Sequence, residues 1–184
     1  MPKPSPWSPD LYRRALVFAA EAHKEQHVPG SARPYVTHPV EVAAEITAQI
    51  AVEPVERPDL AVLCALLHDT VEDTPVTVET IAAIFGDAVA RGVAALSKDA
   101  SLPKEERMAD SLRRIRQEPR EVWMVKLADR IVNLAEPPQH WSREKILAYR
   151  EEAVSIADAL GEASEGLATR LRAKIEAYAQ YASR

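Results

Sequence analysis

The sequence predicts an all-α protein with a single domain. Apolar residues recur at helical spacing along most of the 184 residues, no segment alternates as a strand does, and neither an internal repeat nor an interior linker divides the chain. A chain of this length buries roughly two-thirds of the surface that its unfolded form exposes, which suffices for a stable core. We therefore expect one bundle of about eight to ten helices over residues 1–184.

The first two predicted helices lie on either side of a turn-rich loop. A stripe of apolar residues covers residues 11–27, and Ser8 is placed to cap the start of that helix. The loop over 28–34 contains glycine and proline. Thr37 is the expected cap of a second helix over 39–50, which starts with proline, a residue that costs little at the first helical position.

The third predicted helix is the most apolar. Asp59 is its expected cap, and residues 60–68 begin with a run of eight apolar residues, so that every face of the helix is apolar. A helix of this kind is typical of the centre of a fold. Two shorter helices follow over 77–85 and 87–97, separated by Gly86.

Four more helices are predicted in the second half of the chain. Pro137 and Pro138 stop the second of them, and Gly161 separates the last two. Their expected ranges are 102–117, 119–135, 142–160 and 165–182. The final two carry no motif, so we expect them either to close the core or to form a contact in a homo-oligomer.

Composition narrows the classes of partner. The net charge is −5 and no basic block occurs, which argues against nucleic acid as a partner, since affinity for a duplex depends largely on clustered Lys and Arg. No stretch reaches the roughly 18 successive apolar residues of a membrane span. Met1 to Pro9 lacks the apolar core of a signal peptide, and Cys64 is the single cysteine. These features predict a cytoplasmic protein without a membrane partner.

Four side chains that bind metals or transfer protons lie at the end of the buried helix. They are His68, Asp69, Glu72 and Asp73. Burying carboxylates and an imidazole is costly unless something pairs with them, and a divalent cation is a suitable partner. Successive helical residues point about 100° apart, so His68 and Asp69 can share one ion where the helix ends. Glu72 and Asp73 follow one turn later and face the same cavity.

Two more residues fit the same predicted site. His38 begins the second helix, and Asp129 lies in an otherwise apolar helix, where a carboxylate needs a partner. Together with His68 and Asp69 they would provide two imidazole nitrogens and two carboxylate oxygens. This mixture suits Mn, Fe or Zn and leaves positions open for water and a phosphate oxygen.

The pattern of these residues resembles the HD superfamily of metal-dependent phosphohydrolases. Four phrases are similar to the hydrolase domain of bifunctional alarmone synthetase/hydrolases and of their small stand-alone relatives. These phrases read PYVTHP, LLHDTVEDT, LPKEER and VKLADRIVNL, in the expected order. The resemblance implies an HD-type helical bundle with a motif-bearing core over residues 11–135 and C-terminal helices over 142–182.

The resemblance also implies an activity and a metal. The family hydrolyses the 3′-pyrophosphate of guanosine tetra- and pentaphosphate, (p)ppGpp, commonly with Mn²⁺. His38, His68, Asp69 and Asp129 match the residues that hold this ion. It would polarise a phosphate oxygen of the nucleotide substrate and lower the pKa of bound water.

Four further residues receive roles from the resemblance. Glu72 and Asp73 correspond to the catalytic acids, which position the water and handle its proton. Lys104 and Asn133 match positions near the substrate, where we expect contacts with phosphate and ribose.

The loop after the first helix departs from the family pattern. The family usually has adjacent basic residues there, which help to hold guanine and phosphates, whereas this chain has His27 to Gly30 and a single cation, Arg33, before Tyr35. Another substrate therefore stays open, such as an adenine alarmone, a phosphorylated dinucleotide or a nucleoside phosphate. The alternative from a different class is a non-catalytic module that senses a nucleotide and keeps the metal for structure.

Several residues have ordinary structural explanations. His23 and His27 have i,i+4 spacing, but Lys24 stands where the zincin pattern requires Glu. We therefore expect an exposed helix face for them, or a structural hydrogen bond for His23. Cys64 is expected to be a small core residue, and His140 to lie in a surface loop.

Overall fold

A buried helix, α3 (Pro58–Leu67), is the centre around which the other helices pack. The computed structural model describes residues 6–183, and within them it contains ten α-helices, two 3₁₀ helices and no β-strand beyond an isolated bridge between His27 and Pro34. The predicted all-α class is confirmed. The predicted domain bounds include residues 1–5 and 184, which lie outside the described residues, as does most of the segment from Met1 to Pro9.

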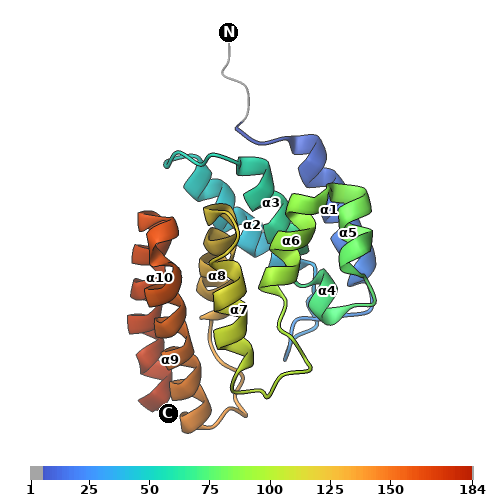
Figure 1. Ribbon diagram of the computed structural model, residues 1–184. Helices are drawn as coiled ribbons and strands as arrows, with labels where there is room; N and C mark the ends of the chain where they lie inside the picture. The colour runs from blue at the N-terminus through green and yellow to red at the C-terminus, as the bar shows by residue number, and fades with distance from the viewer. Residues whose placement is uncertain (1–5, 184) are drawn as a thin grey trace.

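The helices follow one another as Figure 1 shows. They are α1 (Pro9–Ala22), α2 (Thr37–Ile50), α3, α4 (Thr70–Asp73), α5 (Val78–Phe85), α6 (Asp87–Leu96), α7 (Arg107–Ile115), α8 (Arg120–Asn133), α9 (Arg143–Leu160), η1 (Gly161–Ala163), α10 (Glu165–Tyr178) and η2 (Ala179–Ser183). Among residues 6–183, no helix combines the length and the apolar character that crossing a membrane requires.

The third helix is as deeply buried as its composition predicts. Each residue from Leu60 to Leu67 is at most 5% exposed, because α1, α2, α6 and α8 all contact α3. The helix ends at Leu67, inside the core rather than at the surface. The next residue, His68, therefore lies in the interior, where it is only 3% exposed.

The helix α8 joins the central helix to the C-terminal pair. It contacts α3 on one side and both α9 and α10 on the other (Figure 1). Arg130 of α8 is buried, stacks 4.3 Å from the ring centroid of Tyr149 and pairs with Glu152, both on α9. The final helices thus close the core, one of the two arrangements expected, and hold α8 in a defined position.

The predicted helix caps are correct at Ser8 and wrong at Thr37 and Asp59. Ser8 Oγ accepts the N–H of Leu11 at 3.3 Å. Thr37 is the first residue of α2, and its hydroxyl donates to the carbonyl of Pro34. Asp59 lies in the first turn of α3 and accepts the N–H of Ser8 at 2.6 Å. Each of these two side chains binds a partner outside its own helix, so neither serves as a cap.

Two helix boundaries differ clearly from the predictions, the second of them because of side-chain contacts. The first helix ends at Ala22 instead of continuing to residue 27. The seventh begins at Arg107 rather than near 102, since the guanidinium of Arg107 binds the carbonyls of Leu102 and Ala100 and folds that segment back. The short helix α4 was not predicted as a separate element.

Candidate metal and catalytic site

The imidazole of His68 is oriented by the helix that precedes it. Its Nδ1 lies 2.9 Å from the carbonyl oxygen of Ala65, the geometry of an N–H donated to that oxygen. Its Nε2 is buried and has no hydrogen-bond partner among the described residues. In the neutral imidazole the Nε2 lone pair therefore points into the site, which is the form that binds a metal.

The structure brings together all four residues predicted as metal ligands. His68 Nε2 lies 3.0 Å from Asp69 Oδ2 and 3.8 Å from Asp129 Oδ1. His38 Nε2, in the first turn of α2, lies 3.5 Å from Asp69 Oδ2 and 3.4 Å from Asp129 Oδ1. The helices α2 and α8 and the junction between α3 and α4 thus meet at one point in the core.

The geometry and the donor atoms fit a shared divalent ion. Ligand atoms that each lie about 2.1 Å from one ion are at most about 4.2 Å apart. The four nitrogen–oxygen distances, from 3.0 to 3.8 Å, fall within that limit. The ligand atoms of His38, His68 and Asp69 all lie within 4.8 Å of one another, and Asp129 joins these three through the contacts of its Oδ1 with both imidazoles. A cation between these groups would occupy the position that the buried Nε2 of His68 and the carboxylate oxygens face.

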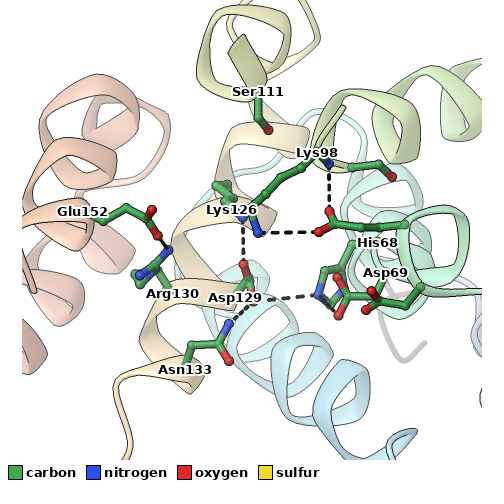
Figure 2. Close-up of polar contacts among 12 residues, drawn as sticks. His68, Asp69, Lys98, Ser111, Lys126, Asp129, Arg130, Asn133 and Glu152 are labelled. Carbon is green, nitrogen blue, oxygen red and sulfur yellow. Dashed lines mark hydrogen bonds and ion pairs between the residues drawn. The ribbon is translucent and has the colours of Figure 1, made fainter. Parts of the chain in front are cut away.

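Asp129 is held in place by two neighbours on its own helix (Figure 2). Lys126 Nζ donates to Asp129 Oδ2 at 3.0 Å, and the side-chain amide of Asn133 donates to Oδ1. Spacings of three and four residues place these side chains on one face of α8. Lys126 is only 6% exposed, so its ammonium serves Asp129 rather than solvent.

The charges of the site are strongly coupled. Burial disfavours the charged form of His68, but Asp69 and Asp129 outweigh it and raise the pKa of the imidazole to about 9. Burial also disfavours ionised Asp69 and Asp129, yet the imidazoles, and for Asp129 foremost Lys126, hold the pKa of both carboxyls below the usual range. Without an ion the site therefore keeps a proton on His68, which a metal would displace.

The two acids that follow the metal-ligand candidates lie on α4. Burial, reinforced by the charges of Asp69 and Glu72, raises the pKa of Asp73 above its usual value. The hydroxyl of Tyr35 donates to Asp69 Oδ2 at 2.7 Å and lies 3.3 Å from Asp73 Oδ2. Glu72 accepts the backbone N–H of Lys98. The phenol of Tyr35 therefore links Asp69, a candidate metal ligand, to Asp73. Glu72 is held instead by Lys98, which follows α6.

Four residues near the site were not identified from the sequence as functional. Tyr35 and Lys126 lie within two of the motif phrases, which is the signal that could have indicated them. Gln26 and Lys98 carry no local signal, because each acts on a residue far away in the chain. Gln26 Nε2, for example, donates to the carbonyl of Asp73 at 2.6 Å.

The two predicted substrate contacts differ in their position. Asn133 lies at the site, where its amide binds Asp129. Lys104 is exposed in the segment before α7, and no hydrogen bond or ion pair of its ammonium occurs within residues 6–183. Both stay predictions as contacts of a nucleotide.

The loop between α1 and α2 contains no uncompensated cation. Its backbone folds back at Gly30, which has φ +76°, and closes with a bond from the N–H of Val28 to the carbonyl of Arg33 at 2.9 Å. The guanidinium of Arg33 pairs with Glu41 of α2 at 2.8 Å. Lys24, the other cation between the two helices, pairs with Glu21 at 2.7 Å, so both basic residues of this segment have an acidic partner.

Four residues have the structural explanations expected of them, although His27 lies outside the helix that was predicted to carry it. Cys64 is buried and His140 is exposed in a turn. His23 is buried, and its Nδ1 lies 2.6 Å from Gln26 Oε1, which is the expected structural hydrogen bond. His27 is exposed beyond the end of α1.

Comparisons with known proteins agree with this geometry. A family model described as HD domain matches residues 15–163. The guanosine-3′,5′-bis(diphosphate) 3′-pyrophosphohydrolase MESH1 of Danio rerio is 36% identical over 148 residues, which cover 78% of this chain and 80% of that protein. MESH1 of Homo sapiens is 34% identical over 152 residues, 79% of this chain and 82% of that protein.

A solved structure supports the same relationship. It is described as a metazoan orthologue of SpoT that hydrolyses ppGpp, and it superposes on this chain with a TM-score of 0.81. The match covers 92% of this chain and 96% of that one at 26% sequence identity. The helical arrangement described above is thus shared over almost the whole length of both chains.

Proposed function

The chain belongs to the HD-domain family, and from this membership we propose that it is a metal-dependent hydrolase that removes the 3′-pyrophosphate from guanosine tetra- and pentaphosphate. The observation that carries the proposal is the convergence of His38, His68, Asp69 and Asp129 beside the acids of α4. The names of the relatives supply the substrate, since each similar MESH1 protein is a guanosine-3′,5′-bis(diphosphate) 3′-pyrophosphohydrolase.

In this proposal His38, His68, Asp69 and Asp129 hold one divalent ion, and Mn²⁺ suits their nitrogen and oxygen donors. When bound, such an ion supplies Lewis-acid chemistry to a phosphate oxygen and to water.

The acids of α4 move the protons of the reaction. Water adds its oxygen to the phosphorus nearest the ribose, the bond from that phosphorus to the 3′ oxygen breaks, and the 3′ hydroxyl and pyrophosphate are formed. Asp73, whose pKa is raised, suits a group that takes a proton from water and passes it on. Glu72 holds the water in line for attack. Lys104 and Asn133 would contact phosphate and ribose.

The remaining partners of the proposal follow from charge and composition. A small nucleotide is the substrate and nucleic acid is not, because the net charge is −5 and no basic block is present. We assign the protein to the cytoplasm, where the buried, unpaired thiol of Cys64 is kept reduced. A homo-oligomer is compatible with the exposed face of the C-terminal helices.

A second candidate substrate is a nucleotide with another base. The observation that favours it is the ion pair between Arg33 and Glu41, which leaves the loop after α1 without a free cation for guanine or its phosphates. Comparing kcat/KM for guanosine and adenosine 3′-diphosphate 5′-diphosphates separates the two candidates.

The experiment that tests the proposal measures pyrophosphate release from guanosine tetraphosphate with added Mn²⁺. We expect turnover by the wild type and a loss of about 10²- to 10⁴-fold in kcat for Glu72→Gln with metal still bound. Glu176→Gln, on the exposed face of α10, is the matched control and should behave as wild type. A metal-loaded wild type that releases no pyrophosphate from any 3′-pyrophosphorylated nucleotide would contradict the proposal.

A further inference from the structure

Both carboxylate oxygens of Glu72 are held by one residue of another element. The backbone N–H of Lys98 donates to Glu72 Oε2 at 2.7 Å, and Lys98 Nζ lies 3.5 Å from Oε1. The two residues are 26 positions apart in the chain. Figure 2 shows Lys98 reaching from beyond the end of α6 towards the segment that carries His68 and Asp69.

The backbone that precedes Lys98 is held by side chains of α7. The guanidinium of Arg114, on α7, donates to the carbonyls of Ala94 and Ala95 and to that of Ser97 at 2.7 Å. Ser111 Oγ, on the same helix, adds a bond to Ala95 at 3.0 Å. These contacts satisfy the last carbonyls of α6, which have no partner within the helix. The N–H of residue 98 is therefore a fixed donor rather than part of a free loop.

The contact also balances charge where carboxylates are crowded. Glu72 and Asp73 lie close to Asp69, and the negative charges of Asp69 and Glu72 both act on Asp73. The side chain of Lys98 is 39% exposed and that of Glu72 26% exposed. An isolated surface pair of this exposure is worth little, but the ammonium here adds to a hydrogen bond from a fixed N–H to the same carboxylate.

We propose that Lys98 is a positioning residue that sets the orientation of Glu72 through its N–H and its ammonium together. The inference rests on the proposed function, in which Glu72 aligns the attacking water. Lys98 acts on the reaction through Glu72 and does not bind the substrate.

Two substitutions at position 98 remove first one donor and then both. Lys98→Met keeps the N–H and the aliphatic stem but loses the ammonium. Lys98→Pro loses both donors, and Ser97, at φ −73° and ψ 134°, already has the extended conformation that a following proline requires. We expect kcat to fall about 3- to 10-fold in Lys98→Met and about 10- to 100-fold in Lys98→Pro.

The split between kinetic constants distinguishes positioning from binding. We expect KM and the affinity for Mn²⁺ to stay within about twofold of wild type in both variants, and Lys98→Arg to recover most of the activity lost in Lys98→Met. Lys174→Met on α10 is the matched control and should leave kcat and KM unchanged. A rise in KM at constant kcat would identify Lys98 as a phosphate ligand and overturn the proposal, as would no change in either constant.

A double-mutant cycle tests whether the effect passes through Glu72. In a Glu72→Gln background, Lys98→Met should change kcat by less than about twofold, because the carboxylate that it orients is gone. An undiminished additional loss would show that Lys98 acts elsewhere.

A measurement that needs no turnover separates this inference from the proposed function. The amide resonance of Lys98 in a ¹⁵N-labelled protein should move upfield in Glu72→Ala and stay in place in Glu176→Gln. If the wild type hydrolyses no nucleotide but this shift occurs, the proposed function fails while the contact stands. If the resonance does not move, the contact and the inference fail whatever the activity.

Discussion

The protonation of His68 determines the net charge of the site. The Nδ1 of its imidazole is engaged by a backbone carbonyl, and its Nε2 faces two carboxylates that raise the pKa of the ring to about 9. A metal needs the neutral imidazole, so ion and proton compete for the same nitrogen. Asp69 and Asp129 do not take part in this competition near neutral pH, because the pKa values of both are lowered.

This competition predicts a pH dependence of metal affinity. Below pH 9 the ion must displace a proton from His68, so the apparent affinity for Mn²⁺ should rise about tenfold per pH unit between pH 6.5 and 9 and then level off. Calorimetry in buffers of different ionisation enthalpy would measure one proton released per ion. His140→Asn, in an exposed turn, should leave the slope unchanged. An affinity independent of pH over this window would contradict the assignment of His68.

The same pKa predicts the stability of the protein without metal. The raised pKa means that His68 contributes stability fully below its unfolded pKa of about 6.5, which is lost as pH rises towards 9. The free energy of unfolding, measured in urea with a chelator present, should fall by up to about 3 kcal/mol across this window. Saturating Mn²⁺ should abolish the decline, and a decline that persists with bound metal would show that another group is responsible.

For individual residues, the sequence identifies the candidate metal ligands but not the residues that orient the side chains of the site. His38, His68, Asp69 and Asp129 stand in recognisable phrases, and the structure gathers all four. Lys98 carries no comparable signal, since it meets Glu72 only after two helices have packed. Contacts of this kind depend on tertiary structure, which local patterns do not encode.

The close approach of α3 and α6 depends on a glycine. Gly92 of α6 faces Cys64 of α3, and a Cβ at this glycine would lie 2.7 Å from Cys64 Sγ and 3.0 Å from Val122 Cγ2. The side chain that is missing at Gly92 therefore lets the two helices approach. The same contact assigns Cys64 a packing role, as its apolar surroundings predict.

Adding a methyl group at this contact should be destabilising. We expect Gly92→Ala to lower the free energy of unfolding by about 1–3 kcal/mol through overpacking. Cys64→Ala should cost less in the Gly92→Ala background than in the wild type, because the clashing sulfur is removed. Gly161→Ala is the control, since its Cβ would meet its nearest neighbour at 3.5 Å. Additive losses in urea unfolding would mean that the two positions do not touch.

The predictions for elements fail where a side chain from elsewhere changes a boundary. The apolar run of α3 is sufficient to predict a buried helix, and all eight residues are buried. The predicted start of α7 near residue 102 was wrong because Arg107 folds residues 100–106 into a turn. The predicted capping role of Asp59 was wrong because its carboxylate accepts the N–H of Ser8, 51 positions away.

For the molecule as a whole, the C-terminal helices are part of the core. The matched HD model ends at residue 163, yet α10 contacts α8 and α9 beyond that point. Leu171 and Tyr178 of α10 are each at most 1% exposed. Removing this helix would uncover the part of α8 that it contacts, so we predict that the helices from α1 to α10 form a single cooperative unit.

Unfolding experiments test this cooperativity. We expect the full chain to give one thermal transition, with far- and near-ultraviolet circular dichroism signals that coincide. A chain that ends at residue 163 should be unfolded or melt at a much lower temperature, because about 25 cal/mol is lost for each Å² of apolar surface that is exposed. Two separate transitions in the full chain, or a truncated chain of unchanged stability, would contradict a single domain.

The measurement that tests the central claim most directly is the identification of the products formed from guanosine tetraphosphate with Mn²⁺ in ¹⁸O-labelled water. The account predicts GDP with an unlabelled 3′ hydroxyl, together with pyrophosphate that carries the label, and the same products formed about 10²- to 10⁴-fold more slowly by Glu72→Gln. Release of orthophosphate, cleavage at the 5′ side, or label on the ribose oxygen would contradict the proposed 3′-pyrophosphate hydrolysis.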